Sequence, residues 1–214
     1  MKFDEGWVNF LAEELKKGYF SSLCAAVQTQ RDEGKTVYPP EGKIFEAFKL
    51  TPFADLKVVI VGDEPYNKQG QSNGLAFSVP TGANLPSATK NIYRELNSTL
   101  NVPISKSGDL TEWAKSGILL LNSVLTVEKG KPKSHANVGW EKFTNNCVKF
   151  ISANSESRIV FCLWGEEAQK KAVFIDRDRH LVLKTSHPDH TTVNRGFSGC
   201  GHFAQINQAT EIWS

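Results

Sequence analysis

The chain has 214 residues, of which 40% are hydrophobic and 22% are charged, and these proportions exclude a disordered, collagen-like or coiled-coil chain. Its 25 Lys and Arg residues against 23 Asp and Glu residues give a formal net charge of +2. That balance is not the strongly basic one of a non-specific nucleic-acid coat protein, although a local basic groove stays open.

No repeat, low-complexity tract or linker divides the sequence, so we expect one domain over residues 1–214. The spacing of apolar residues predicts helices and strands that alternate along the chain. In chain order, the predicted elements are a helix over 5–17 ended by Gly18, a turn over 36–42, a short helix over 43–49, a strand over 56–61, a helix over 87–97 with Ser87 as its N-cap, a strand over 117–121, a helix over 140–152, a strand over 158–163, a helix over 165–173, a strand over 181–184 and a helix over 200–213.

The apolar runs and the cysteines bear on where the protein resides. The longest runs, 58–61 and 118–121, are far shorter than the roughly 18 residues that a membrane span needs. The first residues lack the apolar segment of a secretory signal. The four cysteines form no C-x-x-C pair, and two of them, Cys147 and Cys162, lie inside apolar segments. We therefore expect a reduced cytoplasmic protein with no membrane segment; a disulfide framework is the alternative.

Four short apolar strands separated by helices predict an α/β fold with three α/β/α layers, in which a four-stranded, mainly parallel central sheet is flanked by helices. In such sheets, ligands bind beyond the carboxyl ends of the strands. Carboxylate, aromatic, amide and imidazole groups follow the predicted strands, and together they indicate an enzyme pocket for a planar polar ligand. The segments concerned are 62–67, 122–123, 164–166 and 185–188.

These strand ends resemble the first family of uracil-DNA glycosylases, the Ung type, over nearly the whole chain. The segment GDEPYN at 62–67 is similar to the water-activating loop GQDPYH of that family, and LLLNSVLTV at 119–127 is similar to its LLLNxxLTV motif. Further similar motifs are GQ at 70–71, GLAFSV at 74–79, SH at 134–135, GWE at 139–141, LWG at 163–165, AQKK at 168–171, HP at 187–188 and RGF at 195–197. The resemblance implies the fold of the family and hydrolysis of deoxyuridine in DNA.

The resemblance also implies how the base is recognised once it has left the duplex. Phe77 would stack on the flipped pyrimidine. The amide of Asn122 would match the O4 and N3–H edge of uracil and reject cytosine. Tyr66 would stand against C5 and exclude the methyl group of thymine. A core position for Phe77 and a turn-capping role for Asn122 are the structural alternatives.

Two groups would carry the chemistry of the family. His187 aligns with the histidine that donates to the base O2 as negative charge develops there. Glu64 aligns with the carboxylate beneath the sugar, where the family has Asp, and Asp63 beside it is placed to assist in catalysis and in substrate binding. Glu is longer by one methylene, or about 1.5 Å, and a misplacement of roughly 1 Å can cost about a hundredfold in rate.

The resemblance assigns DNA contacts to a separate set of residues. Thr191 stands where the family inserts Leu into the base stack, and this smaller polar wedge predicts weaker flipping from a duplex. We therefore expect a preference for single-stranded DNA. Glu166 and Glu167 place negative charge beside a phosphate site and predict lower DNA affinity. The implied DNA-binding residues are Ser87, His135, Gly165, Thr191 and Arg195.

Two other functions stay open because the catalytic loop departs from the family pattern: a glycosylase for another damaged or modified pyrimidine, and a catalytically weakened homologue that binds DNA or a partner. His187, His190, Cys200 and His202 fit no common zinc spacing, so we expect no metal and no cofactor. The lysines at 131, 133, 170 and 171 are interpreted as a solvated face. We expect a monomer whose partner is DNA; a protein inhibitor of uracil-DNA glycosylases is a further candidate partner.

Overall fold

Helices and strands alternate over residues 3–213, the part of the chain that this computed structural model describes. The α-helices are α1 (Glu5–Leu15), α2 (Gly18–Asp32), α3 (Glu46–Leu50), α4 (Ser87–Leu100), α5 (Thr111–Lys115), α6 (Trp140–Asn154), α7 (Glu166–Gln169) and α8 (His202–Thr210). The strands are β1 (Val37–Tyr38), β2 (Val58–Gly62), β3 (Ile118–Asn122), β4 (Val127–Glu128), β5 (Val160–Trp164) and β6 (Leu181–Thr185). Short 3-10 turns cover Glu41–Lys43, Phe53–Asp55, Lys170–Phe174 and Val193–Arg195.

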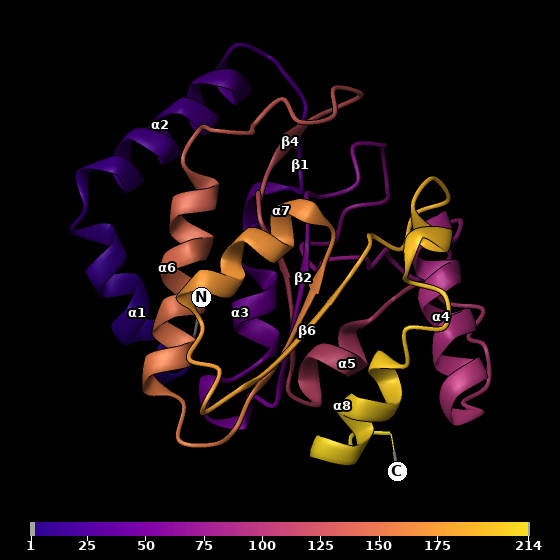
Figure 1. Ribbon diagram of the computed structural model, residues 1–214. Helices are drawn as coiled ribbons and strands as arrows, with labels where there is room; N and C mark the ends of the chain where they lie inside the picture. The colour runs from indigo at the N-terminus through magenta and orange to yellow at the C-terminus, as the bar shows by residue number, and fades with distance from the viewer. Residues whose placement is uncertain (1–2, 214) are drawn as a thin grey trace.

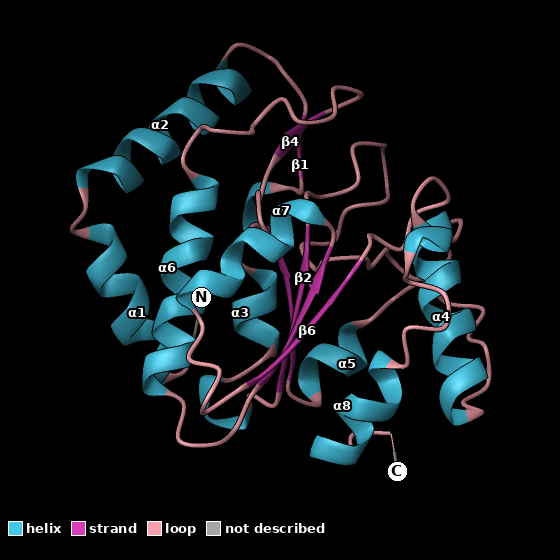
Figure 2. Ribbon diagram, in the orientation of Figure 1, coloured by secondary structure: helices cyan, strands magenta, loops and turns pink. Residues whose placement is uncertain are grey.

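A four-stranded parallel sheet with the order β3-β2-β5-β6 forms the middle of the molecule (Figure 2). Every residue of β2, β3 and β5 is buried, as expected of strands covered on both faces. The edge strand β6 exposes Lys184. The predicted α/β fold with a parallel four-stranded sheet is therefore confirmed. β1 and β4 pair separately as a small antiparallel sheet.

Helices cover both faces of the sheet, with α1, α3 and α6 on one side and α4, α5 and α8 on the other (Figure 1). An aromatic cluster fills the first side. The ring of Trp7 lies 4.9 Å from that of Phe48, and the ring of Phe10 lies 5.3 Å from that of Phe143. Since these rings come from α1, α3 and α6, the N-terminal helix packs into the same core as the middle of the chain.

The N-terminal region contains a helix that the apolar spacing did not predict. Gly18 does not end the helical region; α1 ends at Leu15, and Gly18 begins α2. The turn between the two helices is held by Glu14, which is 2% exposed and accepts hydrogen bonds from the Tyr19 hydroxyl and from the Asn146 amide. Because one of these partners comes from α6, local periodicity did not reveal the turn.

The ends of several elements also differ from the prediction. β2 and β3 extend to Gly62 and Asn122, so that these two residues pair across neighbouring strands. The predicted helix over 165–173 divides into α7 and a 3-10 turn. Pro86 rather than Ser87 is the N-cap of α4, so the predicted cap is wrong. The extension of the two strands places Asn122 directly beside Gly62 at the end of the sheet.

The interpretation of all four lysines as a solvated face is wrong for Lys171. Its side chain is 2% exposed, and Nζ donates hydrogen bonds to Thr144 Oγ1 and Asn145 Oδ1, each at 2.8 Å. Burial lowers the pKa of Lys171 to about 8. Its neighbour Lys170 is exposed and pairs with Glu167 at 2.7 Å, so the two adjacent lysines have different roles.

The cysteines of residues 3–213 form no disulfide. All four cysteines are free, and Cys147 and Cys162 are fully buried. Burial raises the pKa of both of these thiols. Across the described residues, none of the helices is both long enough and apolar enough to span a bilayer.

Candidate active site

A cavity of about 700 Å³ opens beyond the carboxyl ends of the parallel strands. Its wall includes the loops that follow β2, β3 and β6 and the first turn of α4. Seven residues singled out from the sequence line it together: Asp63, Glu64, Tyr66, Phe77, Ser87, Asn122 and His187. The structure therefore brings together groups that lie up to 124 positions apart in the chain.

Phe77 and Tyr66 are held in place by one hydrogen-bonded residue of α4. Phe77 adopts a left-handed backbone conformation with φ 64°, which is uncommon for a bulky residue. Its carbonyl oxygen accepts a hydrogen bond of 2.6 Å from the Thr89 hydroxyl, and that hydroxyl lies 3.2 Å from the Tyr66 hydroxyl. Since the Thr89 proton goes to Phe77, Tyr66 donates to Thr89. Burial raises the pKa of Tyr66 to about 12.

Asn122 presents a free amide to the cavity beside the Phe77 ring. Its side chain is 7% exposed and makes no hydrogen bond to another residue of 3–213. A Cβ atom on Gly62 would lie 2.9 Å from Asn122 Oδ1 and 2.9 Å from Phe77 Cζ. Gly62 therefore lets the amide and the ring approach each other closely at the end of β2.

Glu64 is held by the backbone of a distant loop. The N–H of Lys133 donates to both carboxylate oxygens of Glu64, at 2.8 Å and 3.1 Å. Lys133 itself is left-handed, with φ 61°. Burial raises the pKa of Glu64, as does the nearby Asp63 carboxylate, while the Lys133 N–H opposes the rise. The Lys133 N–H thus holds the Glu64 side chain, which is one methylene longer than an Asp side chain would be.

Asp63 lies deeper and has fewer partners. Its Oδ1 atom is buried without a hydrogen-bond partner among the described residues. The same atom lies 3.2 Å from where a Cβ on Gly165 would stand, and His187 Cβ lies 3.4 Å from that point, so a side chain at 165 would crowd both. Burial raises the pKa of Asp63, the Glu167 and Asp189 carboxylates raise it further, and His187 opposes them.

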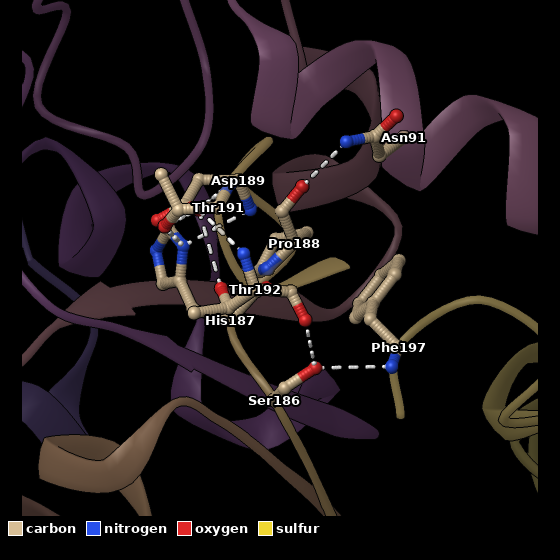
Figure 3. Close-up of polar contacts among 8 residues, drawn as sticks. All are labelled: Asn91, Ser186, His187, Pro188, Asp189, Thr191, Thr192 and Phe197. Carbon is tan, nitrogen blue, oxygen red and sulfur yellow. Dashed lines mark hydrogen bonds and ion pairs between the residues drawn. The ribbon is translucent and has the colours of Figure 1, made fainter. Parts of the chain in front are cut away.

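Asp189 and Phe77 fix the ring of His187, and Figure 3 shows the contact with Asp189. The Nδ1 atom of the ring accepts a hydrogen bond from the backbone N–H of Asp189 at 3.2 Å, and Asp189 Oδ2 also lies 3.2 Å from it. The Phe77 ring packs against the imidazole with 5.4 Å between ring centroids. Because His187 lines the cavity and Nδ1 is engaged, Nε2 is the nitrogen free to meet a ligand.

The predicted DNA-binding residues do not all reach the cavity. Ser87 lines it, whereas Thr191 and Arg195 are exposed on the loop after β6. Gly165 is buried at the start of α7. His135 is completely buried, and its two ring nitrogens lie 2.7 Å from Thr126 Oγ1 and 3.0 Å from Gln30 Oε1. His135 therefore holds a loop, and neither ring nitrogen is free for a direct phosphate contact.

Several residues of the site were given no functional role by the sequence. Ser123 lines the cavity with a buried hydroxyl that has no partner among residues 3–213. Thr89 and Lys133 act through hydrogen bonds to residues far along the chain, which no local pattern signals. Asp189 was detectable, since it lies two residues after His187.

His187, His190, Cys200 and His202 form no metal-binding cluster within the described part of the chain. Over residues 3–213, no three His, Cys, Asp or Glu residues are arranged to hold a metal ion. His202 Nδ1 instead accepts a hydrogen bond of 3.2 Å from the indole of Trp164.

Comparisons with known proteins agree with this geometry. Residues 48–211 match the model of the uracil DNA glycosylase superfamily. The chain is 47% identical over 202 residues to the uracil-DNA glycosylase of Psychromonas ingrahamii, covering 94% of this chain and 93% of that one. The crystal structure of mimivirus uracil-DNA glycosylase superposes with a TM-score of 0.91 and 25% identity, over 98% of this chain and 83% of that one. A variant of mimivirus UNG in complex with UGI superposes with a TM-score of 0.90 and 25% identity, over 96% and 84%. The chain thus belongs to the uracil-DNA glycosylase family.

Proposed function

We propose that this chain excises uracil from DNA as the first step of base excision repair, leaving free uracil and an abasic site. The observation that carries the proposal is the meeting of Tyr66, Phe77, Asn122 and His187 in one cavity at the carboxyl end of the sheet. These groups supply stacking, shape exclusion, edge recognition and a proton donor in a single pocket large enough for one extruded nucleotide.

Base recognition follows from the positions of three side chains. The face of Phe77 stacks on the pyrimidine, and the free amide of Asn122 pairs with O4 and N3–H. Cytosine presents the opposite donor and acceptor pattern and leaves that amide unpaired, which is a costly mismatch in a buried site. Tyr66, held by Thr89, blocks the C5 methyl group of thymine.

In the hydrolysis, water oxygen bonds to C1′ as the C1′–N1 bond breaks, and the bonding electron pair leaves with the base. His187 Nε2–H donates to O2 of the departing uracil, where that charge gathers. The carboxylates stabilise the cationic sugar, orient the water and take up its proton. We assign this role to Glu64 with Asp63 assisting, because both line the cavity and neither forms an ion pair within residues 3–213.

Uracil release from oligonucleotides tests the function and the assignment together. Wild type should release uracil, while Glu64→Gln and His187→Ala should each lose activity by about a hundredfold or more. Full activity of Glu64→Gln with an inactive Asp63→Asn would move the carboxylate role to Asp63. No release by wild type at high enzyme concentration would refute excision of uracil and favour the weakened DNA-binding homologue or a different base.

DNA contact is assigned to Ser87, Thr191 and Arg195, with His135 and Gly165 acting through their neighbours. Thr191 is exposed, and its hydroxyl donates to Asp189, so it offers a small wedge in place of a long apolar one. We infer a preference for single-stranded substrate. Thr191→Leu should raise the rate on duplex DNA more than on single strands; equal wild-type rates on both substrates would contradict this inference.

We further infer that the chain acts as a monomer and that an inhibitor such as UGI binds at the DNA-facing end of the sheet. The support is the mimivirus relative crystallised with UGI, whose fold this chain shares over most of its length. Light scattering would give the mass in solution, and UGI should block uracil release in competition with DNA. Uracil release unaffected by saturating UGI would contradict this partner.

A further inference from the structure

Thr89 lies behind the base pocket, in the first turn of α4, where its side chain is completely buried. Its hydroxyl contacts two residues that line the cavity. It donates to the carbonyl oxygen of Phe77 at 2.6 Å and accepts from the Tyr66 hydroxyl at 3.2 Å. Burial raises the pKa of Tyr66 to about 12, so at neutral pH the phenol keeps the proton that the second bond needs. One hydroxyl therefore joins the Tyr66 and Phe77 sides of the pocket.

The bond to Phe77 restrains a backbone that needs restraint. Phe77 has a φ of 64°, in the left-handed region that a bulky residue rarely adopts. Its ring packs against Trp164 and His187, with 5.5 Å and 5.4 Å between ring centroids. Without the Thr89 donor, the backbone is able to relax toward an ordinary conformation, and the ring then moves with it. The position of the stacking surface therefore depends on Thr89.

The bond to Tyr66 restrains a side chain that comes from a loop. Tyr66 lies in the segment after β2, outside any helix or strand. Among the described residues, its hydroxyl has no hydrogen-bond partner other than Thr89. A bond at the far end of the side chain restricts both of its torsion angles, and it therefore fixes the ring that would face C5 of the base.

We propose that Thr89 is a positioning residue for base selection: by holding Phe77 and Tyr66 through one hydroxyl, it sets the preference for uracil over pyrimidines that carry a C5 group. This deepens the function proposed above and rests on it. The Phe77 ring stacks on any pyrimidine, whereas the Tyr66 ring excludes only bases with a C5 substituent. Because both are bound to the same atom of α4, neither ring shifts without the other, and the space at C5 stays constant.

Thr89→Val is the decisive variant because valine has nearly the shape of threonine but neither donates nor accepts a hydrogen bond. The kcat/KM for uracil in single-stranded DNA should fall about tenfold, since the stacking ring is displaced. The preference for uracil over its 5-methyl counterpart should also fall about tenfold or more, because exclusion of one methyl group depends on a tight pocket. Thr89→Ser keeps the hydroxyl, so both quantities should stay within about threefold of wild type.

The preference is measured as binding, so that differences between leaving groups do not enter. One single strand carries 2′-fluoro-deoxyuridine and the other its 5-methyl counterpart. The fluorine at C2′ withdraws electrons from the sugar and opposes a cationic C1′, so the bond to the base stays intact. The ratio of the two dissociation constants then reports only how well the pocket excludes the methyl group.

Tyr66→Phe separates the two bonds of Thr89. It removes the phenol hydroxyl and leaves the bond from Thr89 to Phe77, so it should lower the preference against the 5-methyl base. In this background Thr89→Val should lower the preference by much less than it does in wild type, because the shared bond is already absent. Fully additive losses would show that Thr89 does not act through Tyr66 and would overturn the proposal.

Thr51 provides a matched control at the opposite end of the sheet. Its hydroxyl is also completely buried and donates to a backbone carbonyl oxygen, that of Ala114, at 2.9 Å. It also lies 3.3 Å from the carbonyl oxygen of Ile118, the first residue of β3. Thr51→Val is therefore the same chemical change away from the cavity, and it should leave the preference unchanged. A loss of preference equal to that of Thr89→Val would overturn the proposal.

The outcomes for Thr89 and for the proposed function are separate. A preference that is the same in wild type and Thr89→Val, or the absence of any preference in wild type, would overturn the role of Thr89. Absence of uracil release by wild type would overturn the function instead, while the two uncleavable strands still test the effect of Thr89 on binding.

Discussion

Gly62 is the residue on which the shape of the base pocket depends. Its missing side chain leaves room for Asn122 Oδ1 and Phe77 Cζ, each 2.9 Å from where Cβ would stand. Gly62→Ala should push these groups apart and lower kcat/KM on uracil-containing DNA by about tenfold to a hundredfold, since small displacements of positioning groups are costly. Steady-state kinetics measure this loss. Gly42→Ala is the control, because nothing lies within 4 Å of that position; equal losses in the two variants would contradict the account.

Asp63 lowers the stability of the site that it serves. Burial raises the pKa of Asp63 above its ordinary value of 3.8. At a pH above this raised pKa, the ionised carboxylate therefore lowers the stability of the folded protein. The destabilisation disappears as the pH falls below 3.8. Asp63→Asn should therefore raise the free energy of unfolding by about 1 kcal/mol at pH 7.5. Urea unfolding should detect a smaller gain at pH 4.5. A gain that grows toward acid pH would contradict this sign, and the exposed Asp178→Asn is the control.

At the scale of elements, helix α4 anchors both ends of the loop after β6. The Asn91 amide donates to the carbonyl oxygen of Pro188 at 2.8 Å. One turn further on, the buried Glu95 carboxylate accepts from the N–H groups of Gly199 and Gly201, at 2.7 Å and 3.1 Å. Since Asn91 and Glu95 are four residues apart, they lie on one face of the helix. The helix therefore sets where His187 and Thr191 stand.

Removal of the Glu95 carboxylate should lower the free energy of unfolding. Glu95→Ala leaves two backbone N–H groups without their acceptor and should cost about 2–4 kcal/mol of unfolding free energy, measured by chemical denaturation. Glu112→Ala removes a carboxylate that is 82% exposed and paired with Lys115, and it should cost less than about 0.5 kcal/mol. Similar costs for the two variants would show that the loop is not anchored through α4.

At the scale of the whole molecule, both halves of the chain build one sheet and one core. β2 comes from the first half of the chain and β3, β5 and β6 from the second, and the N-terminal α1 packs on α6. We therefore propose that residues 1–214 behave as one domain and unfold in a single transition. Tryptophan fluorescence and far-ultraviolet circular dichroism should give the same midpoint in urea. Two separated midpoints would indicate independent units.

The charged side chains that line the cavity oppose DNA binding, because acids outnumber lysines there. The cavity wall carries five acids against three lysines, namely Asp63, Glu64, Glu141, Glu167 and Asp189 with Lys68, Lys133 and Lys170. The near-neutral net charge of the chain is therefore not accompanied by a basic cavity. We propose that affinity for DNA comes from exposed basic residues outside the cavity, Arg195 among them.

The sequence by itself determined the sheet and the membership of the site. The apolar runs in β2, β3 and β5 predict buried strands because burial on both faces demands apolar side chains at every position. In a parallel sheet the carboxyl ends meet at one edge, so Tyr66, Asn122 and His187 were expected together, whereas Phe77 was expected there only from the family resemblance. The alternation of strands and helices along the chain was sufficient for this, because a helix between two strands returns the chain to the same end of the sheet.

Only the tertiary structure decided which partner each charged group has. Glu64 is bound by a backbone N–H 69 residues away, and Asp63 is left unpaired next to Gly165. The helix α2 and the burial of Lys171 were missed for the same reason, since their partners lie on α6. Periodicity records which positions are buried, whereas hydrogen bonds between distant loops depend on how those loops close in space, and that geometry exists only once the sheet has formed.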